Sequence, residues 1–291
     1  MNHPAQANYL LIDGALRPDA LVGLYQRHEL FEIDALYLGT RWKDLHDLGP
    51  ILIRPDSRSS LLSDWLEHES LRKDSTLIYS RADIDQVAAH LRHFISPPDC
   101  LGGGGLLRFA DPLVTHFWLS SYPHGASQHL GPIEQWWVGA PRQSWEAPHQ
   151  VQWQTFSGPG AEFVWDERHA VLGEDQLDAL DLAQRWRFTG RIYNWLGERS
   201  PDLFSGLTGS QISDWLNSSL QAGLEWGLVT ERALAMWMEA CADYGEDFAT
   251  RAQGPYPQWL SQNATNAGLA PELRIRAFEL HSRTHKEVVH D

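Results

Sequence analysis

"TLIYSRADIDQVAAHLRHFI", residues 76–95, joins a short apolar run to an amphipathic segment. Residues 76–80 are few and mostly apolar with no helical period, so they predict a buried strand. Ser80 and Asp83 stand three residues apart where the pattern changes, which is the spacing of a helix-capping pair. From there to residue 95 the apolar side chains recur at helical spacing. A strand that leads directly into a helix predicts a layered α/β fold.

The same alternation of strand and helix extends through the first half of the chain. We expect further strands at residues 9–13, 34–38 and 50–56, and helices at 18–28, 41–49 and 59–70. Two more strand-like pieces, 133–139 and 149–157, lie in a region rich in Pro, Gly and Trp, and a turn cluster follows at 157–163. Residues 7–157 are therefore expected to form an α/β lobe with a mixed sheet and flanking helices.

The second half of the chain has helical periodicity throughout. The segments that show it are 173–200, 209–228, 230–245 and 270–289, and a turn is expected at 255–262. Thr230 stands where a helix N-cap is needed, and Gly245 stands where the same helix would end. Residues 172–291 are therefore expected to form a second, all-α lobe.

Composition excludes several classes of partner. The chain has 291 residues and a formal net charge of −15, which disfavours nucleic acid and anionic membrane surfaces because these are held by Lys and Arg. No apolar run approaches the roughly 18 residues of a membrane span, and the first residues do not resemble a signal peptide. The two cysteines, Cys100 and Cys241, are expected to be buried thiols in a reducing compartment. We expect a cytoplasmic protein that does not insert into membranes.

Four consecutive glycines in "CLGGGGLLRFADP", residues 100–112, raise the question of a phosphate-binding loop. A Walker loop needs Gly-Lys-Ser/Thr after the glycines, but Leu106 and Leu107 follow here. A dinucleotide fingerprint needs a helix directly after spaced glycines. We therefore expect a flexible connection that enters a strand at 106–111. Asp111 can then cap a helix at 112–121, with Pro112 in its first position.

Catalytic motifs are missing from the sequence. There is no G-x-S-x-G elbow, and neither cysteine lies in a nucleophile signature. His281 and His285 are four residues apart, as in a zinc site, but "HSRTH" lacks the glutamate of a metalloprotease motif. We expect these histidines on a solvated helix face. No catalytic, metal or cofactor-binding residue is predicted, and the chain is not expected to be an enzyme.

Tryptophan is unusually abundant. The chain has 14, and eleven of them follow residue 130. Indoles fill protein cores, and they are also enriched in the energetic centres of interfaces. The sequence alone does not separate these two uses.

An ordered set of segments resembles the effector-adaptor (effector-chaperone) family of bacterial type VI secretion, first catalogued as a domain of unknown function. The segments are "YLLIDGAL" (9–16), "LGPILIRP" (48–55), 76–95, "GGLLRFADPLV" (104–114) and "LGPIEQWW" (130–137). The family's Phe-Arg-Phe-Tyr-Asp-Pro-like motif is matched by Arg108, Phe109, Asp111 and Pro112, whereas Leu107 and Ala110 depart from it. Residues 221–248 are similar to the family's second lobe.

The resemblance implies an adaptor that binds a secreted toxin, the effector, stabilises it and helps load it onto the secretion spike protein. It implies no nucleotide and no other cofactor, and it makes the glycine stretch a scaffold element in which Arg108 is paired inside the lobe. We expect the helical lobe to bind the effector through some of four tryptophans, namely Trp195, Trp215, Trp226 and Trp237. Two alternatives stay open, namely an immunity protein that neutralises a toxin and a metal-dependent or hydrolytic enzyme.

Overall fold

The computed structural model describes residues 4–100, 103–147, 152–161 and 172–289. The chain divides into two compact units. The first comprises residues 1–142 and 149–184, and the second comprises 143–148 and 185–291. The division thus falls inside the helix α6 (Glu174–Arg199), whereas we expected it between residues 157 and 172.

The first unit is built on a six-stranded sheet with the order β2-β3-β1-β4-β5-β6. The strands are β1 (Tyr9–Asp13), β2 (Phe31–Ala35), β3 (Pro50–Pro55), β4 (Ser75–Tyr79), β5 (Gln135–Gly139) and β6 (Trp153–Ser157). The layered α/β class is as expected. We expected a mixed sheet, but every neighbouring pair of strands is antiparallel. β1 and β2 run in the same direction but are not neighbours, because β3 lies between them, which is a split β-α-β arrangement.

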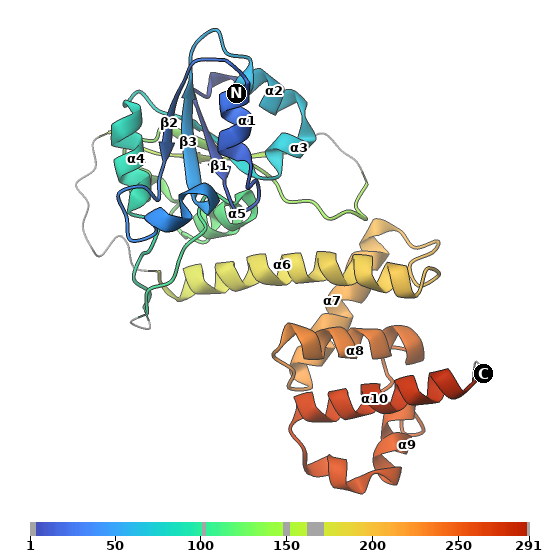
Figure 1. Cartoon of the computed structure of the whole chain (residues 1–291). Helices are drawn as coiled ribbons and strands as arrows, with labels where there is room; N and C mark the ends of the chain where they lie inside the picture. Colours follow the sequence, from blue (N-terminus) through green and yellow to red (C-terminus); the bar gives the residue numbers. More distant parts are fainter. Residues whose placement is uncertain (1–3, 101–102, 148–151, 162–171, 290–291) are drawn as a thin grey trace. The chain divides into compact units, whose positions relative to one another are not determined.

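Helices cover both faces of this sheet (Figure 1). Leu10 and Ile12 of β1 point to one face, where they pack against α1 (Ala20–Gln26) and α2 (Leu61–Glu67). Tyr9 and Leu11 point to the other, where α4 (Ile84–Arg92) and α5 (Pro112–Ser120) lie. Because both faces are covered, all five residues of β1 are buried. This explains why the sequence of β1 is a continuous apolar run rather than an alternating one.

The start of α4 differs from the expected one by one turn. Asp83 is the N-cap. Its side chain accepts from the Gln86 amide at 2.9 Å, and the Gln86 side chain accepts from the Asp83 amide at 3.3 Å. Ser80, the expected cap, instead donates its hydroxyl proton to the Pro132 carbonyl at 2.6 Å. The N-cap of the helix is therefore three residues later than expected. The Ser80 side chain is hydrogen-bonded to the chain that leads into β5 and does not cap the helix.

The segment 106–111 forms no strand, contrary to expectation. Its apolar residues Leu107, Phe109 and Ala110 are buried, but a turn closes on them through a hydrogen bond from the Asp111 amide to the Arg108 carbonyl at 3.0 Å. The Thr115 hydroxyl donates to the Phe109 carbonyl at 2.5 Å. Backbone groups that a sheet would have paired are thus satisfied locally. The expected cap is present, since Asp111 accepts from the Leu113 amide at 3.1 Å.

Smaller differences concern element type and bounds. β2 begins at Phe31 rather than at residue 34. Residues 43–48 form a 3₁₀ helix, η2 (Lys43–Leu48), instead of an α-helix. The expected turn at 255–262 is the helix α9 (Pro255–Gln262). Of the expected strand at 149–157, residues 149–151 lie outside the described residues.

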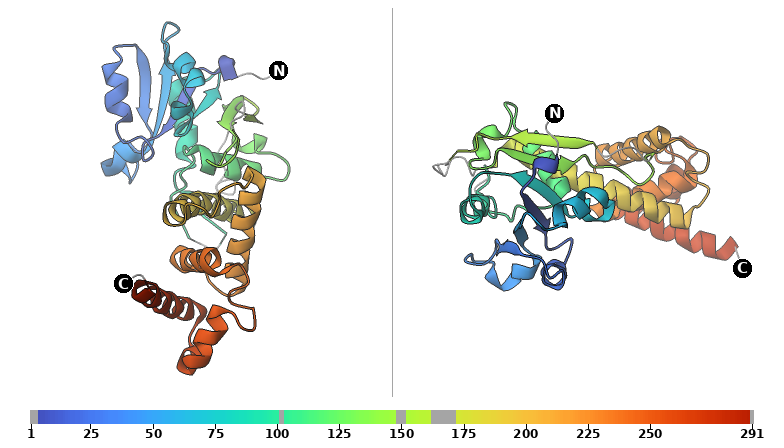
Figure 2. Two further views of the ribbon diagram at one scale, coloured as in Figure 1. Left: turned by 90° about the vertical axis from the view of Figure 1, so that its right-hand side faces the viewer. Right: turned by 90° about the horizontal axis from the view of Figure 1, so that it is seen from above.

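The second unit is helical. It contains the end of α6 together with α7 (Gly209–Glu225), α8 (Glu231–Tyr244), α9, the 3₁₀ helix η5 (Ala264–Gly268) and α10 (Pro271–Val289). α8 packs against both α7 and α10 (Figures 1 and 2). Thr230 caps α8 by accepting from the Ala233 amide at 3.3 Å, and Gly245 ends it with φ = 91°. Both roles were expected from the sequence.

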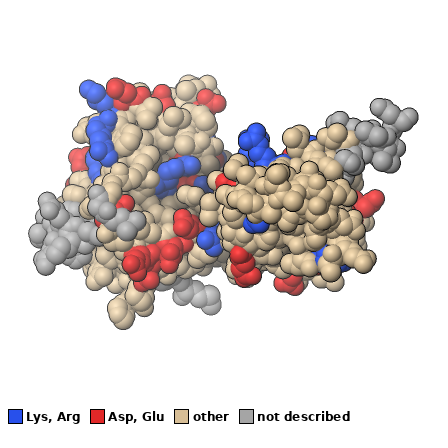
Figure 3. Space-filling model, turned by 90° about the horizontal axis from the view of Figure 1, so that it is seen from below, with Lys and Arg blue, Asp and Glu red and all other residues tan. Residues whose placement is uncertain are grey.

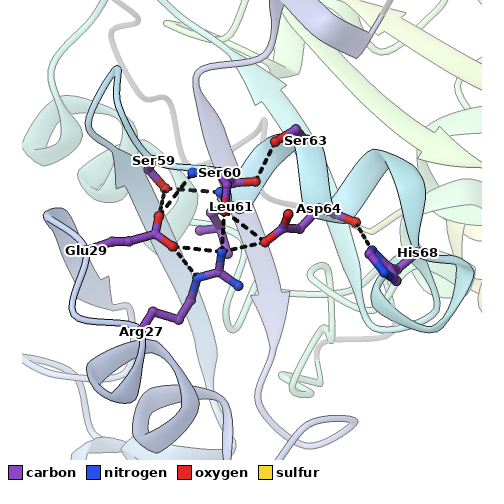
Figure 4. A network of polar contacts seen from close by, with 8 residues as sticks. All are labelled: Arg27, Glu29, Ser59, Ser60, Leu61, Ser63, Asp64 and His68. Atoms are coloured by element: carbon purple, nitrogen blue, oxygen red, sulfur yellow. Dashed lines mark hydrogen bonds and ion pairs between the residues drawn. The ribbon is translucent and has the colours of Figure 1, made fainter.

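A polar network joins α1 to α2 in the first unit (Figure 4). The Arg27 guanidinium lies between the carboxylates of Glu29 and Asp64, and it also donates to the Ser60 hydroxyl at 2.9 Å. Glu29 accepts from the Ser59 hydroxyl and from the Ser60 amide. These hydrogen bonds and the charge of Arg27 lower the pKa of both carboxyl groups. The network fixes the first turn of α2 against the end of α1.

Both cysteines are free thiols, but only Cys241 is buried as expected. Burial raises the pKa of Cys241 to about 12. Cys100 is exposed, contrary to expectation, because it lies in the connection after the strand–helix pairs rather than in an element with a core face. Among the described residues, no helix has the length and apolarity that crossing a membrane requires.

Candidate functional site

Trp237, one of the four tryptophans expected to bind a partner, is a core residue. It is 3% exposed. Its ring centroid lies 5.2 Å from that of Trp226 and 4.8 Å from that of Phe248. It shares the inward face of α8 with Leu234 and Cys241, which are also buried. Trp237 is therefore not one of the candidate tryptophans that can line a binding groove.

Trp195 and Trp226 are partly exposed, and an arginine covers each of them. The Arg199 guanidinium carbon lies 5.1 Å from the Trp195 ring centroid, and that of Arg274 lies 4.6 Å from the Trp226 ring centroid. Both arrangements are within the range of a cation–π contact. A partner that used these indoles would have to displace a favourable contact within the chain.

Trp215 belongs to a row of partly exposed aromatic rings that we call the aromatic strip. The strip consists of Trp145, Tyr193, Phe204 and Trp215. Successive ring centroids are 4.6 Å, 4.9 Å and 5.6 Å apart in that order. These distances are those of aromatic pairs in direct contact. All four rings pack with one side on the core of the second unit.

Four pieces of chain contribute to the strip, and three of them follow one another along the chain. Tyr193 lies on α6 between the buried Ile192 and Leu196. Phe204 follows in the turn between α6 and α7, and Trp215 lies on α7 next to the buried Leu216. A capping box between Thr208 and Gln211 fixes the start of α7, because each side chain accepts from the other's backbone amide. Tyr193 and Trp215 thus lie on defined helices, and Phe204 lies in the turn that joins them.

Trp145 comes from the hexapeptide 143–148, which belongs to the second unit although it precedes β6. Two hydrogen bonds hold this piece in place. The Gln143 side-chain amide donates to the Trp186 carbonyl at 2.8 Å, and the Trp145 indole donates to the Ser213 hydroxyl at 2.9 Å. The exposed Leu207 adds apolar surface in the turn that carries Phe204.

The chemistry that this surface offers is burial of apolar groups. Aromatic side chains bury a large area and lose few rotamers when they do so, and for this reason they dominate interface energetics. Sequence reasoning found Trp215 but missed Trp145, Tyr193 and Phe204. Nothing in their local sequence distinguishes these three from core residues, because only the tertiary arrangement aligns them.

Arg108 of the expected scaffold motif is paired inside the first unit. Its guanidinium lies 2.9 Å from an Asp13 carboxylate oxygen and 3.4 Å from an Asp111 carboxylate oxygen. Both carboxylates are buried, with side chains 5% and 1% exposed. Burial raises the pKa of Asp13, and the hydrogen bond from Arg108 opposes that shift. The motif thus connects the end of β1 to the start of α5, where Pro112 occupies the first turn. Phe109, which precedes the helix, is fully buried.

Among the described residues, no group of three or more His, Cys, Asp or Glu side chains is arranged to hold a metal ion. His281 packs near the Trp259 ring, with centroids 6.4 Å apart. The side chain of His285, the other histidine of the expected pair, lies outside the described residues.

A second surface of this unit is nearly free of charge. Residues 252–271 contain no Asp, Glu, Lys or Arg. They form α9 and η5 and lead into α10. Figure 3 shows a broad uncharged expanse on the face of the second unit seen from below, with charged groups toward its border. Glycine, alanine and uncharged polar residues are the most common types in residues 252–271. This segment therefore offers fewer large apolar anchors than the aromatic strip.

Comparison with known proteins gives a family match over part of the chain. Residues 8–128 match a family described as a domain of unknown function (DUF4123). The matched range runs from β1 to the 3₁₀ helix η3 (Ser127–His129) and includes the Arg108 motif. The four residues of the aromatic strip lie beyond its end. No curated protein and no solved structure matched the chain.

Proposed function

We propose that this chain is an adaptor of bacterial type VI secretion. In this proposal it binds a toxic effector in the cytoplasm of the producing cell, keeps the effector soluble and helps load it onto the secretion spike protein. Two things support the proposal. One is the ordered resemblance of residues 9–137 to the effector-adaptor family, and the other is a match of residues 8–128 to a domain whose function is not known.

The aromatic strip is the observation that carries the proposal. A protein that holds another polypeptide needs apolar surface that stays accessible while the protein itself remains soluble. Four aromatic rings in contact, each partly exposed and each backed by the core, meet the first requirement. The net charge of −15 meets the second, because like charges keep unloaded copies apart.

The two units then have different roles. The second unit contacts the effector through the strip. The first unit, which contains the family motif around Arg108, contributes to the same complex or contacts the spike protein.

Co-purification tests the proposal. The chain is co-expressed with a tagged copy of the toxin encoded beside its gene, and the captured amount is compared with that of variants F204A/W215A and Y25A. Tyr25 is 72% exposed on α1 of the first unit and so serves as a matched control for loss of an exposed ring. We expect wild type and Y25A to capture the toxin and F204A/W215A to lose most of it. Equal capture by all three folded proteins would refute the role of the strip.

An immunity protein is the second candidate, and the net charge of −15 is the observation that favours it. An acidic surface suits a basic toxin domain, because complementary charge speeds association. Toxin activity separates the two functions. An adaptor leaves the activity of the bound toxin intact, whereas an immunity protein abolishes it at equimolar concentration.

A further inference from the structure

The charged residues nearest in the sequence to three of the four rings of the aromatic strip are acidic. Between Arg199 and Glu225 the chain has only two charged residues, Asp202 and Asp214. Asp202 lies two positions before Phe204, Asp214 directly precedes Trp215, and both are exposed. Glu146 directly follows Trp145 and is partly exposed. Three of the four rings therefore have a carboxylate within two residues and no basic residue that close.

Two arginines of α6, one on each side of Tyr193 in the sequence, are held by other carboxylates. Arg191 forms an ion pair with Glu231 at 2.6 Å. Arg199 forms one with Glu239 at 2.7 Å and also covers Trp195. Because these guanidinium groups are engaged within the unit, they do not neutralise Asp202 and Asp214. The strip is thus an apolar surface with carboxylates next to three of its rings in the sequence.

We propose that the aromatic strip binds a basic amphipathic segment of the effector. Its leucine, phenylalanine or similar side chains pack on the rings, while its lysine or arginine side chains meet Asp202 and Asp214. The inference rests on the proposed function, because it takes the segment to belong to the effector. The basic and apolar character of the segment follows from charge complementarity at the strip itself. Cationic side chains are doubly suited here, because they also bind to the faces of indole rings.

The two kinds of contact have separable consequences. Carboxylates at the border of an interface act mainly on the association rate and on the choice of partner, and salt weakens them. Buried aromatic anchors act mainly on the dissociation rate. Binding is therefore expected to depend on the rings at every ionic strength and on the carboxylates mainly at low ionic strength.

Synthetic peptides test the chemistry without the effector. The probes are three amphipathic peptides with the same leucine and phenylalanine positions, whose other positions are lysine, glutamine or glutamate. Their binding to the full chain is measured by fluorescence anisotropy. At about 50 mM salt we expect the lysine peptide to bind about tenfold more tightly than the glutamine peptide and the glutamate peptide to bind least, with smaller differences at about 300 mM.

Matched variants locate the effect. D202N/D214N should remove the preference for lysine over glutamine. E225Q should keep it, because Glu225 lies eleven residues beyond Asp214 on α7, about 16 Å along the helix axis. F204A/W215A should remove binding of all three peptides. A lysine preference that survives in D202N/D214N or in F204A/W215A would show attraction by the overall negative charge, and it would overturn the inference. Equal binding of the lysine and glutamine peptides to wild type would overturn it too.

The effector itself separates failure of this inference from failure of the proposed function. If capture of the co-expressed toxin falls in F204A/W215A but is unchanged in D202N/D214N at low salt, the chain is an adaptor and the basic segment is refuted. If neither pair of substitutions changes capture, the strip has no role in effector binding.

Discussion

The indole N–H of Trp145 donates a hydrogen bond to the Ser213 hydroxyl at 2.9 Å, which joins residues 68 positions apart. One end of the bond lies in the hexapeptide 143–148 and the other on α7. The bond fixes the first ring of the aromatic strip to the helix that carries the last one. It therefore holds Trp145 in place at one end of the row.

Removing this hydrogen bond should loosen the strip without unfolding the unit. We expect S213A to lower the free energy of unfolding by about 1 kcal/mol, the usual contribution of such a bond. W145F should have a similar effect, and the double variant should cost no more than either single one. Urea denaturation followed by circular dichroism measures the three values. Strictly additive losses would show that the two side chains do not act as a pair.

Tryptophans of the second unit should fall into two classes. W237A removes an indole that is 3% exposed, and we expect a loss of about 3–5 kcal/mol in unfolding free energy. W215A removes a partly exposed ring, so the protein should stay folded and lose partner binding instead. Thermal unfolding and effector capture, measured on the same samples, distinguish the two outcomes. A W237A protein that unfolds at the wild-type temperature would contradict its assignment to the core.

The Arg108 motif should act on stability rather than on binding. R108M leaves the buried carboxylates of Asp13 and Asp111 without their cation, which we expect to cost about 3 kcal/mol at neutral pH. The loss should shrink as the pH is lowered toward 5. Burial already raises the pKa of Asp13, and without the opposing hydrogen bond from Arg108 this carboxyl group takes up a proton more readily. The unfolding free energy of both proteins between pH 5 and 8 checks the trend.

His90 predicts acid sensitivity in the first unit. It is buried on α4, where its Nε2 atom lies 2.9 Å from the His129 carbonyl oxygen, and burial lowers the pKa of His90 to about 4. In the unfolded state the His90 imidazole binds a proton near pH 6.5, whereas in the folded state it does so only near pH 4. Stability is therefore lost as the pH falls through this window, by on the order of 3 kcal/mol in total.

H90Q should reduce this slope and keep a side chain that can donate to the same carbonyl. Denaturation midpoints from pH 4 to 7 give the measurement. A residual slope is expected from His93 and His116, because burial lowers the pKa of both. An unchanged profile in H90Q would mean that His90 does not account for the acid sensitivity.

The periodic parts of the fold could be predicted from the sequence. Helices α6, α7 and α8 have regular apolar spacing, and α8 also has clear end signals in Thr230 and Gly245. The segment 106–111 was predicted wrongly as a strand because burial and apolar composition do not fix the backbone. Phe109 is fully buried, yet the Thr115 hydroxyl and a turn satisfy the carbonyl groups that a strand would have paired.

The candidate site could be predicted only in part. Abundant indoles in the second half indicated an aromatic surface, but α8 buries Trp237 while α7 leaves Trp215 partly exposed. The difference depends on which neighbour each helix packs against, and a single helical pattern does not contain that information. Trp145 was unpredictable for a stronger reason, since it reaches the strip from a segment that lies beside the strands in the sequence.

The placement of residues 143–148 makes the helical unit discontinuous along the chain. During translation this hexapeptide leaves the ribosome before α6 and α7 have been synthesised. Its hydrogen bonds to Trp186 and Ser213 can therefore form only after β6 and these helices have been made. A truncated gene that starts at residue 185 would encode four of the helices but neither Gln143 nor Trp145. The Trp186 carbonyl and the Ser213 hydroxyl would then lose their donors. An isolated helical unit therefore has to be engineered with the hexapeptide grafted ahead of α6.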